Sequence, residues 1–175
     1  MKITLHLNQV LFKPLCFILL ILMYASCDFG SSADRGKVGT PAPAFSVVDI
    51  GGNKYSSEKL DGKVLVLNFW FVACPPCIRE IPELNQLVEK YKNEEVVFLA
   101  FARDSKSKLK KFLEKTRFDY NIVARSKWVA KVFNTHGWPT NIIVDKNGDI
   151  VFHKAGYDKE RVTEMDGIIS TLIKE

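Results

Sequence analysis

Residues 68–82 read NFWFVACPPCIREIP, and the rest of the chain can be understood from this stretch outward. It joins an apolar run at 64–71 to an amphipathic run at 75–91. The first run is nearly unbroken in its apolar character, which predicts a strand buried on both faces. The second carries apolar residues at helical spacing, which predicts a helix with one face toward the core. Two cysteines therefore lie where a buried strand passes into a helix.

Cys74 and Cys77 fall in the first turn of that predicted helix. A helix N-terminus carries unpaired N–H groups and the positive end of the helix dipole, and both favour a thiolate over a thiol. The spacing puts the second cysteine one turn after the first, close enough to form a disulfide. Such a pair can pass between dithiol and disulfide through a mixed disulfide, so the pattern indicates a redox motif.

The two residues between the cysteines, Pro75 and Pro76, refine this interpretation. Pro75 suits the first helical position, where its missing N–H is not needed. Because both prolines lack an N–H, the amide of Cys77 is the nearest backbone donor left to a Cys74 thiolate. Fewer donors stabilise the thiolate less, which favours a reductant over a strong oxidant.

The chain has four cysteines, and the other two, Cys16 and Cys27, lie in or at the end of an N-terminal apolar segment. The rest of the chain therefore cannot build a framework of structural disulfides. Two other readings of the central pair are an inert buried pair and a zinc site. Zinc would also need His136 and His153, which lack zinc-finger spacing. We predict no metal and no cofactor beyond a redox-active disulfide.

Residues 1–27 resemble a bacterial lipoprotein signal. Two lysines precede a ten-residue apolar run at 15–24, and small residues then lead to Cys27. The run suits a signal peptide and is short for a membrane span. Cys27 is the predicted lipidation site, although Tyr24 stands where an aliphatic residue is usual, so ordinary cleavage or an uncleaved anchor stay open. All three readings place the domain outside the cytoplasm.

After this segment, residues 28–40 are small and polar and predict a flexible tether, and residues 41–175 predict one domain. Without residues 1–26 the chain keeps 23 basic and 20 acidic residues, a net charge of +3. The basic cluster at 106–111 lies on a predicted helix and indicates a solvated face, so we expect no nucleic-acid partner.

The remaining elements follow from periodicity and turn residues. We expect strands at 45–50, 54–56, 94–103, 120–124, 140–145 and 150–154, helices at 105–116, 127–133 and 158–174, turns at 51–53 and 146–149, and a short helical connection at 57–62. Pro82 should kink the helix that contains it. This order predicts an α/β fold with a mixed sheet.

With these motifs the chain resembles the thioredoxin superfamily, and most of all its TlpA/ResA-like membrane-anchored thiol-disulfide oxidoreductases. The resemblance covers about residues 39–175. Three parts carry it: residues 68–82, the Gly-Trp-Pro-Thr motif at 137–140, and residues 39–45 together with the helix–strand unit at 105–124. It implies a thioredoxin-like fold, a central mixed β-sheet flanked by helices, with an N-terminal β-hairpin and an extra helix–strand insert.

The resemblance also implies roles for single residues. Cys74 would be the exposed attacking thiolate and Cys77 the buried resolving thiol. Pro139 would be a cis-proline beside the disulfide, whose preceding backbone pairs with substrate. Trp138 and Trp70 would line the thiol groove as substrate-binding residues, with plain core packing as the alternative for Trp70.

Glu80, one turn beyond Cys77, would tune the cysteines and transfer protons as a third catalytic residue. The alternative is a solvated charge near a helix start. Asn68 stands where cytosolic thioredoxins have a buried acid, so any proton relay must use Glu80 or water. Ala73 replaces the tryptophan that many relatives have before the first cysteine. His136 is expected to be a half-exposed loop residue.

The leading hypothesis is a monomeric extracytoplasmic reductase of disulfides in exported proteins. It would be anchored to the membrane through lipid and regenerated by a membrane electron donor. Its partners in this family include apocytochromes that await haem. A copper-delivery protein stays open, although that class has one more residue between its cysteines. A disulfide oxidase or isomerase would differ in reduction potential alone. A peroxidase is disfavoured, because Val72 and Ala73 do not give its usual context.

Overall fold

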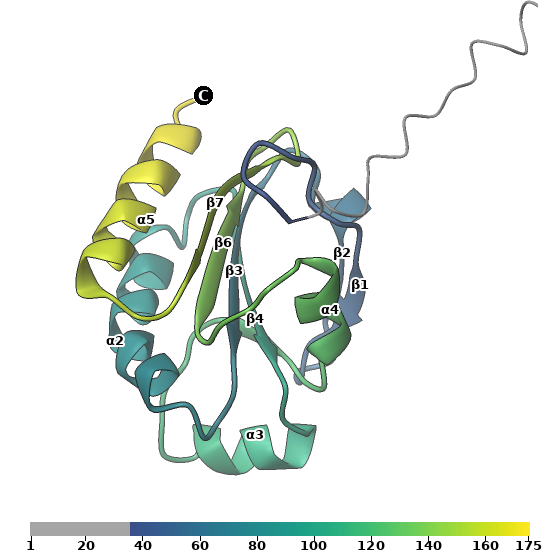
Figure 1. Cartoon of the computed structure of the whole chain (residues 1–175), viewed down its shortest axis with the longest axis vertical. Helices are drawn as coiled ribbons and strands as arrows, with labels where there is room; N and C mark the ends of the chain where they lie inside the picture. The colour runs from purple at the N-terminus through teal and green to yellow at the C-terminus, as the bar shows by residue number, and fades with distance from the viewer. Residues whose placement is uncertain (1–35) are drawn as a thin grey trace, which may run out of the picture. The chain divides into compact units, whose positions relative to one another are not determined.

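The computed structural model describes residues 36–175. Its centre is a five-stranded sheet of order β5-β4-β3-β6-β7, beside a separate β1-β2 hairpin (Figure 1). The strands are β1 (Ser46–Val48), β2 (Lys54–Ser56), β3 (Val64–Trp70), β4 (Val96–Ala102), β5 (Asn121–Val123), β6 (Thr140–Val144) and β7 (Ile150–Ala155). Strands β3, β4 and β5 are parallel, whereas β6 is antiparallel to β3 and β7 to β6. The predicted mixed sheet and N-terminal hairpin are confirmed.

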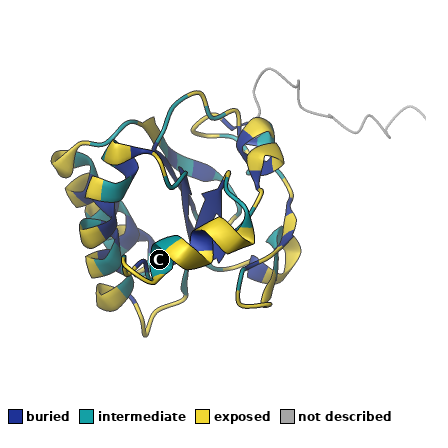
Figure 2. Ribbon diagram, turned by 90° about the horizontal axis from the view of Figure 1, so that it is seen from below, coloured by how far each residue is buried: buried dark blue, intermediate teal, exposed yellow. Residues whose placement is uncertain are grey.

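Helices cover both faces of the sheet. They are the 3-10 helix η1 (Ser57–Leu60) and the α-helices α2 (Pro75–Lys90), α3 (Lys106–Leu113), α4 (Lys127–Val132) and α5 (Lys159–Leu172). Helices α2 and α5 lie on one face, and α4 lies on the other beside the hairpin (Figure 1). Buried residues gather on the strands and on the inner sides of the helices, while the outer helix surfaces are exposed (Figure 2). The expected elements are all present, with ends shifted by a few residues.

Strand β3 is the middle strand of the sheet, and all seven of its residues are buried. Its side chains alternate between the faces. Val66 and Trp70 join the core under α2 and α5, and Leu67 and Phe69 join the core under α4 and the hairpin. Asn68 shares the face of Val66 and Trp70 by this alternation, so its polar side chain points toward α2.

Helix α2 begins directly after Cys74, which is its N-cap residue, and continues through Pro82 to Lys90. The prolines at the first two helical positions cost no intrahelical hydrogen bond there. Its buried face includes Ile81, Leu84 and Leu87, as the helical spacing predicted.

Backbone pairing with the sheet begins before residue 41. The Gly39 N–H donates to the Ile150 carbonyl at 2.8 Å, and the Ile150 N–H donates to the Thr40 carbonyl at 2.9 Å. The Ala42 N–H donates to the Gly148 carbonyl, also at 2.8 Å. The end of the segment predicted as a tether therefore runs along the start of β7.

The predicted signal segment at 1–27, with Cys27, and the first part of the tether lie outside the described residues. From residue 36 to the C-terminus, no helix has the length and apolar character that a membrane crossing needs.

Candidate active site

The two cysteines form a disulfide at the point where β3 passes into α2. The sulfur atoms are 1.99 Å apart and the Cα atoms 5.3 Å apart. The Cys77 N–H donates to the Cys74 Sγ at 3.3 Å, and the N-cap position of Cys74 makes this contact possible. The predicted nearest donor to Cys74 is therefore the one that the structure shows.

Both cysteines are buried, and each is 2 % exposed. The expectation of an exposed Cys74 is wrong for this disulfide form, whereas the burial of Cys77 is confirmed. The reason is that Cys74 is bonded to Cys77, and both belong to the core under α2. Val72 and Trp138 are partly buried and pack against the same core.

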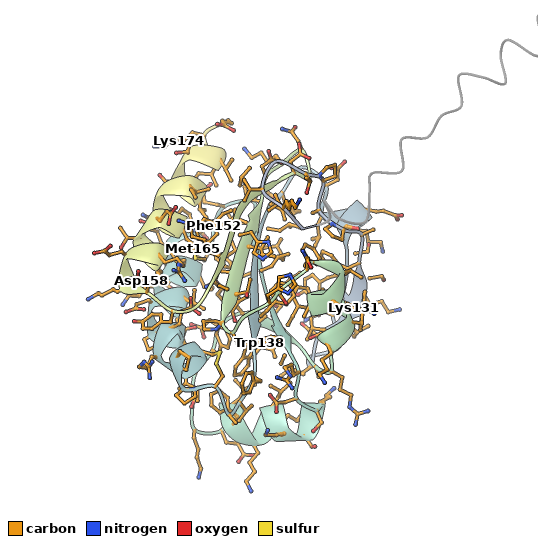
Figure 3. The ribbon with its side chains drawn as sticks, viewed as in Figure 1. Lys131, Trp138, Phe152, Asp158, Met165 and Lys174 are labelled. Carbon is orange, nitrogen blue, oxygen red and sulfur yellow. A yellow bond between two sulfur atoms is a disulfide. The ribbon has the colours of Figure 1, made fainter. Side chains whose placement is uncertain are left out.

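The peptide bond between Trp138 and Pro139 is cis, as the resemblance implied. It leads directly into β6, whose first residue, Thr140, pairs with Phe69 near the end of β3. Trp138 is half-buried, and its ring meets the edge of the Phe71 ring at 5.9 Å between centroids. Figure 3 shows Trp138 near the end of the sheet from which α2 starts.

Trp70 does not line the thiol groove. It is 1 % exposed and packs against Phe112 and Phe118, with ring centroids 5.4 and 5.2 Å away. Because β3 side chains alternate, its ring points into the core under α2. Of the two readings offered for Trp70, the structure shows core packing.

Glu80 is fully buried, so the reading of a solvated charge is wrong. Asn68 of β3 donates to the Glu80 Oε2 at 3.3 Å, and Asn141 of β6 donates to its Oε1. Asn68 also donates to the Asn141 Oδ1 at 2.8 Å, and the two are register partners across β3 and β6. A carboxyl group on the first turns of α2 is thus held by two amides from neighbouring strands.

Burial is the main cause that raises the pKa of Glu80, to about 7. The hydrogen bonds from Asn141 and Asn68 and the charge of Arg161 act in the opposite direction, and the charge of Glu83 adds to the rise. A carboxyl with such a pKa can hold or release a proton near neutral pH. Tyr120 lies in the same core, where burial first and the charge of Glu80 second raise the pKa of its hydroxyl.

Three residues that contact predicted site residues or the loop before Cys74 were not found from the sequence. Arg103 lies over the rings of Phe71 and Trp138, at 5.0 and 5.5 Å from their centroids. Asp104 accepts a hydrogen bond from the Val72 N–H at 2.7 Å and pairs with Lys108. Asn141 holds Glu80. For Asn141 a signal existed, since it is a polar residue inside an apolar strand.

The histidines lie apart from the cysteines. His136 is exposed on the loop before Trp138, and the His153 ring contacts the Gly36 carbonyl. Within residues 36–175, no three His, Cys, Asp or Glu side chains gather in a way that could hold a metal ion. The arrangement supports disulfide exchange with a nearby proton carrier.

Comparisons with known proteins agree with this chemistry. Residues 38–153 match the AhpC/TSA family. The chain is similar to the thiol-disulfide oxidoreductase ResA of Geobacillus kaustophilus (strain HTA426), with 34% identity over 140 residues that cover 76% of this chain and 80% of that protein. It is similar to the ResA of Bacillus thuringiensis (strain Al Hakam), with 32% identity over 154 residues that cover 82% and 86%.

Solved structures show the same fold. A thiol:disulfide interchange protein of the thioredoxin family from Chlorobium tepidum TLS matches with a TM-score of 0.67 and 26% identity, over 77% of this chain and 96% of that one. The thioredoxin domain of a Bacteroides vulgatus thiol-disulfide oxidoreductase gives a TM-score of 0.67 at 25% identity, over 76% and 98%. With a Cys-Pro-Pro-Cys disulfide at the start of α2 and a cis-proline at the start of β6, the chain belongs to the AhpC/TSA family of the thioredoxin superfamily and is a thiol-disulfide oxidoreductase of the ResA type.

Proposed function

We propose that this oxidoreductase works outside the cytoplasm as a reductase of disulfides in exported proteins. The observation that carries the proposal is the disulfide at the start of α2, in a chain that also has a buried Glu80 one turn after Cys77 and a cis peptide bond between Trp138 and Pro139. The pair Cys74–Cys77 exchanges electrons with a substrate disulfide, and no further cofactor takes part.

The reaction begins from the reduced pair. The Cys74 thiolate attacks one sulfur of the substrate disulfide, which breaks that bond and releases the other substrate sulfur as a thiolate. The Cys77 thiol then loses its proton and displaces the remaining substrate sulfur from Cys74. The substrate gains two electrons and two protons, and the protein is left with the disulfide that the structure describes.

Glu80 is our candidate for the group that takes the Cys77 proton. It lies one turn after Cys77 on α2, in the same buried region, and its pKa of about 7 suits proton exchange near neutral pH. Asn68 and Asn141 act as positioning residues, since their amides fix the carboxyl group from two strands. Pro139 and Trp138 would receive the substrate segment that flanks its cysteine.

The setting of the reaction is part of the proposal. Cys27 would carry a lipid that anchors the chain to the bacterial membrane on the extracytoplasmic side. A membrane electron donor would return the disulfide to the dithiol, and apocytochromes awaiting haem are candidate substrates. The similarity to ResA proteins supports this setting, as does the apolar run that precedes Cys27 in the sequence.

A redox titration tests the direction of electron flow. The full chain with Cys16→Ser and Cys27→Ser, so that Cys74 and Cys77 alone titrate, is equilibrated in dithiothreitol or glutathione buffers. Its oxidised fraction is then measured by thiol alkylation. We expect a reduction potential near or below that of thioredoxin, about −270 mV.

A potential near about −120 mV would contradict the reductase and make the protein a disulfide donor. If no dithiol–disulfide transition occurred at all, the whole proposal would be wrong, and copper binding by the cysteines would be the next measurement. A Cys74→Ser variant is the control, because it must show no transition.

A further inference from the structure

We propose that a groove beside helix α4 binds an acidic, extended segment of the substrate polypeptide next to its reacting cysteine. This inference rests on the proposed function and names the substrate class that the site prefers. We call the feature the α4 groove. It has a volume of about 540 Å³, and its lining includes Lys127, Trp128, Lys131, His136 and Trp138.

Trp138 connects the α4 groove with the thiol site. It lines the groove, forms the cis peptide with Pro139, and packs against the core that contains both cysteines. The Trp138 ring also contacts Phe71, which begins the loop that leads to Cys74. A substrate whose cysteine is bonded to Cys74 must lead its chain past this loop, and the groove provides a path for it.

The floor of the α4 groove is apolar and exposed. Trp128 is 47 % exposed, and it is one of three large apolar side chains that are exposed within residues 36–175. Tryptophan is a residue type that often carries the binding energy of a protein interface. Its place in a concave surface that Trp138 also lines indicates a contact with a partner polypeptide.

The rim of the groove is basic. Lys127, Lys131 and the adjoining Arg103 have no carboxylate partner within the described part of the chain. A second hollow of about 300 Å³ continues the surface, and it is lined by Arg103, Asp104 and Lys108 and shares Lys127 with the groove. The Asp104 carboxylate does not neutralise these three cations, because it accepts a hydrogen bond from the Val72 N–H and pairs with Lys108.

The positive charge of this rim favours an acidic segment as the ligand of the groove. Unpaired cations around an apolar floor complement a segment that carries Asp or Glu beside apolar residues. A polypeptide fits better than a membrane surface, because the groove is concave and is lined by Trp138, which precedes the cis-proline. Figure 3 shows Lys131 on the side of the sheet away from α5, and Trp138 near the end of the sheet.

Two peptides of equal length test the proposal. Each has a single cysteine capped as a mixed disulfide with thionitrobenzoate, and one carries glutamates where the other carries glutamines. The reduced full chain, with Cys16→Ser and Cys27→Ser, attacks the peptide sulfur through Cys74 and releases coloured thionitrobenzoate. Cys77 then displaces the peptide thiol, and the protein becomes oxidised.

We expect the glutamate peptide to react about tenfold faster than the glutamine peptide at low ionic strength, with the ratio falling as salt is added. In a Lys127→Glu and Lys131→Glu double variant the ratio should fall to about one or below. The matched control changes Lys159 and Lys174 of the α5 region to Glu, on the other face of the sheet. It makes the same change in net charge and should keep the ratio.

Equal rates for the two peptides would overturn the groove proposal, as would a ratio that survives the double variant. A double variant that alters binding to vesicles with anionic lipid, but not the peptide ratio, would replace the proposal with a membrane-facing surface. Failure of both peptides to react would instead count against the proposed reductase, so the two failures can be told apart.

Discussion

At the scale of single residues, Glu80 is a buried ionisable group on α2, one turn after Cys77. The strand position that cytosolic thioredoxins use for a buried acid is Asn68 here, and Asn68 instead donates to the Glu80 carboxyl. Glu80 and Asn68 therefore have different roles. Glu80 can exchange a proton, and Asn68 together with Asn141 fixes where that proton is held.

The pKa of Glu80 predicts how stability changes with pH. Burial raises this pKa to about 7 in the folded chain, above the ordinary value of 4.5. Between these values the folded state binds more protons than the unfolded state, so the free energy of unfolding falls as pH rises. The loss is complete above the folded pKa and amounts to about 3 kcal/mol.

A Glu80→Gln variant should remove this loss. We expect urea unfolding of the disulfide form to give similar stabilities for variant and native chain at pH 4, and a variant that is more stable by about 2–3 kcal/mol at pH 8. Glu89→Gln, an exposed residue on the same helix, is the control and should show no such growth with pH. A stability difference for Glu80→Gln that does not change with pH would contradict the raised pKa.

The partners of Glu80 show where reasoning from the sequence ends. The motif predicted Cys74, Cys77 and Pro139, because each depends on a short pattern with a known geometry. Glu80 was left between two readings, since its burial depends on Asn141, far along the chain in β6. The sequence shows Asn141 only as a polar residue in an apolar strand. Its partner, Glu80, lies far from it in the sequence, so the local pattern could not predict their contact.

At the scale of elements, the loop between β3 and α2 is held by the strand beside it. Asp104, just after β4, accepts a hydrogen bond from the Val72 N–H at 2.7 Å. Its chain continues into α3 through Ser105, the N-cap of that helix. The end of β4 therefore positions the loop that carries Cys74, although the two segments are separated by a whole helix in the sequence.

An Asp104→Ala variant should destabilise the domain by about 1–3 kcal/mol, because the Val72 amide loses its acceptor. Asp104→Asn keeps an acceptor for the Val72 N–H and loses only the ion pair with Lys108, whose side chain is 51% exposed, so it should recover most of the loss. Both values come from urea unfolding. Glu164→Ala removes an exposed ion pair with Lys154 and serves as the control.

If Asp104→Asn were as damaging as Asp104→Ala, the charge of the carboxylate rather than its contact with Val72 would be what matters. A Glu164→Ala loss as large as that of Asp104→Ala would contradict the special position of Asp104. The exposed pair on its own should give well under about 1 kcal/mol.

The helices and strands themselves were predicted well, because they rest on local signals, although their ends differ by a few residues. Strand β3 is a run of buried residues, the hairpin between β6 and β7 has an Asn-Gly turn, and α5 begins after Asp158, whose side chain accepts from the Glu160 N–H. The order of strands in the sheet and the contact of β4 with the cysteine loop are long-range facts, and neither was predicted from the sequence.

At the scale of the whole molecule, one sheet separates two cores. Leu84 of α2 lies fully buried in the first, and Leu67 of β3 lies fully buried in the second. Because the strands contribute alternate residues to both cores, neither face can lose its packing without loosening the other.

Leu84→Ala and Leu67→Ala should therefore each lower the free energy of unfolding by about 2–5 kcal/mol and shift one common transition. The check is urea unfolding followed by both tryptophan fluorescence and far-ultraviolet circular dichroism. Lys54→Ala on the exposed hairpin should change stability little. Two separate transitions in either leucine variant would show that the faces unfold independently.

The backbone pairing of residues 39–42 with the start of β7 has a consequence for solubility. Strand β7 is an edge of the five-stranded sheet, and an uncovered edge offers N–H and C=O groups to any strand that meets it. Gly39, Thr40 and Ala42 occupy part of that edge through their hydrogen bonds to Ile150 and Gly148. A chain that began at Phe45 would keep the cysteines and the cis-proline. It would expose this part of the β7 edge to other molecules, and so would be prone to aggregation.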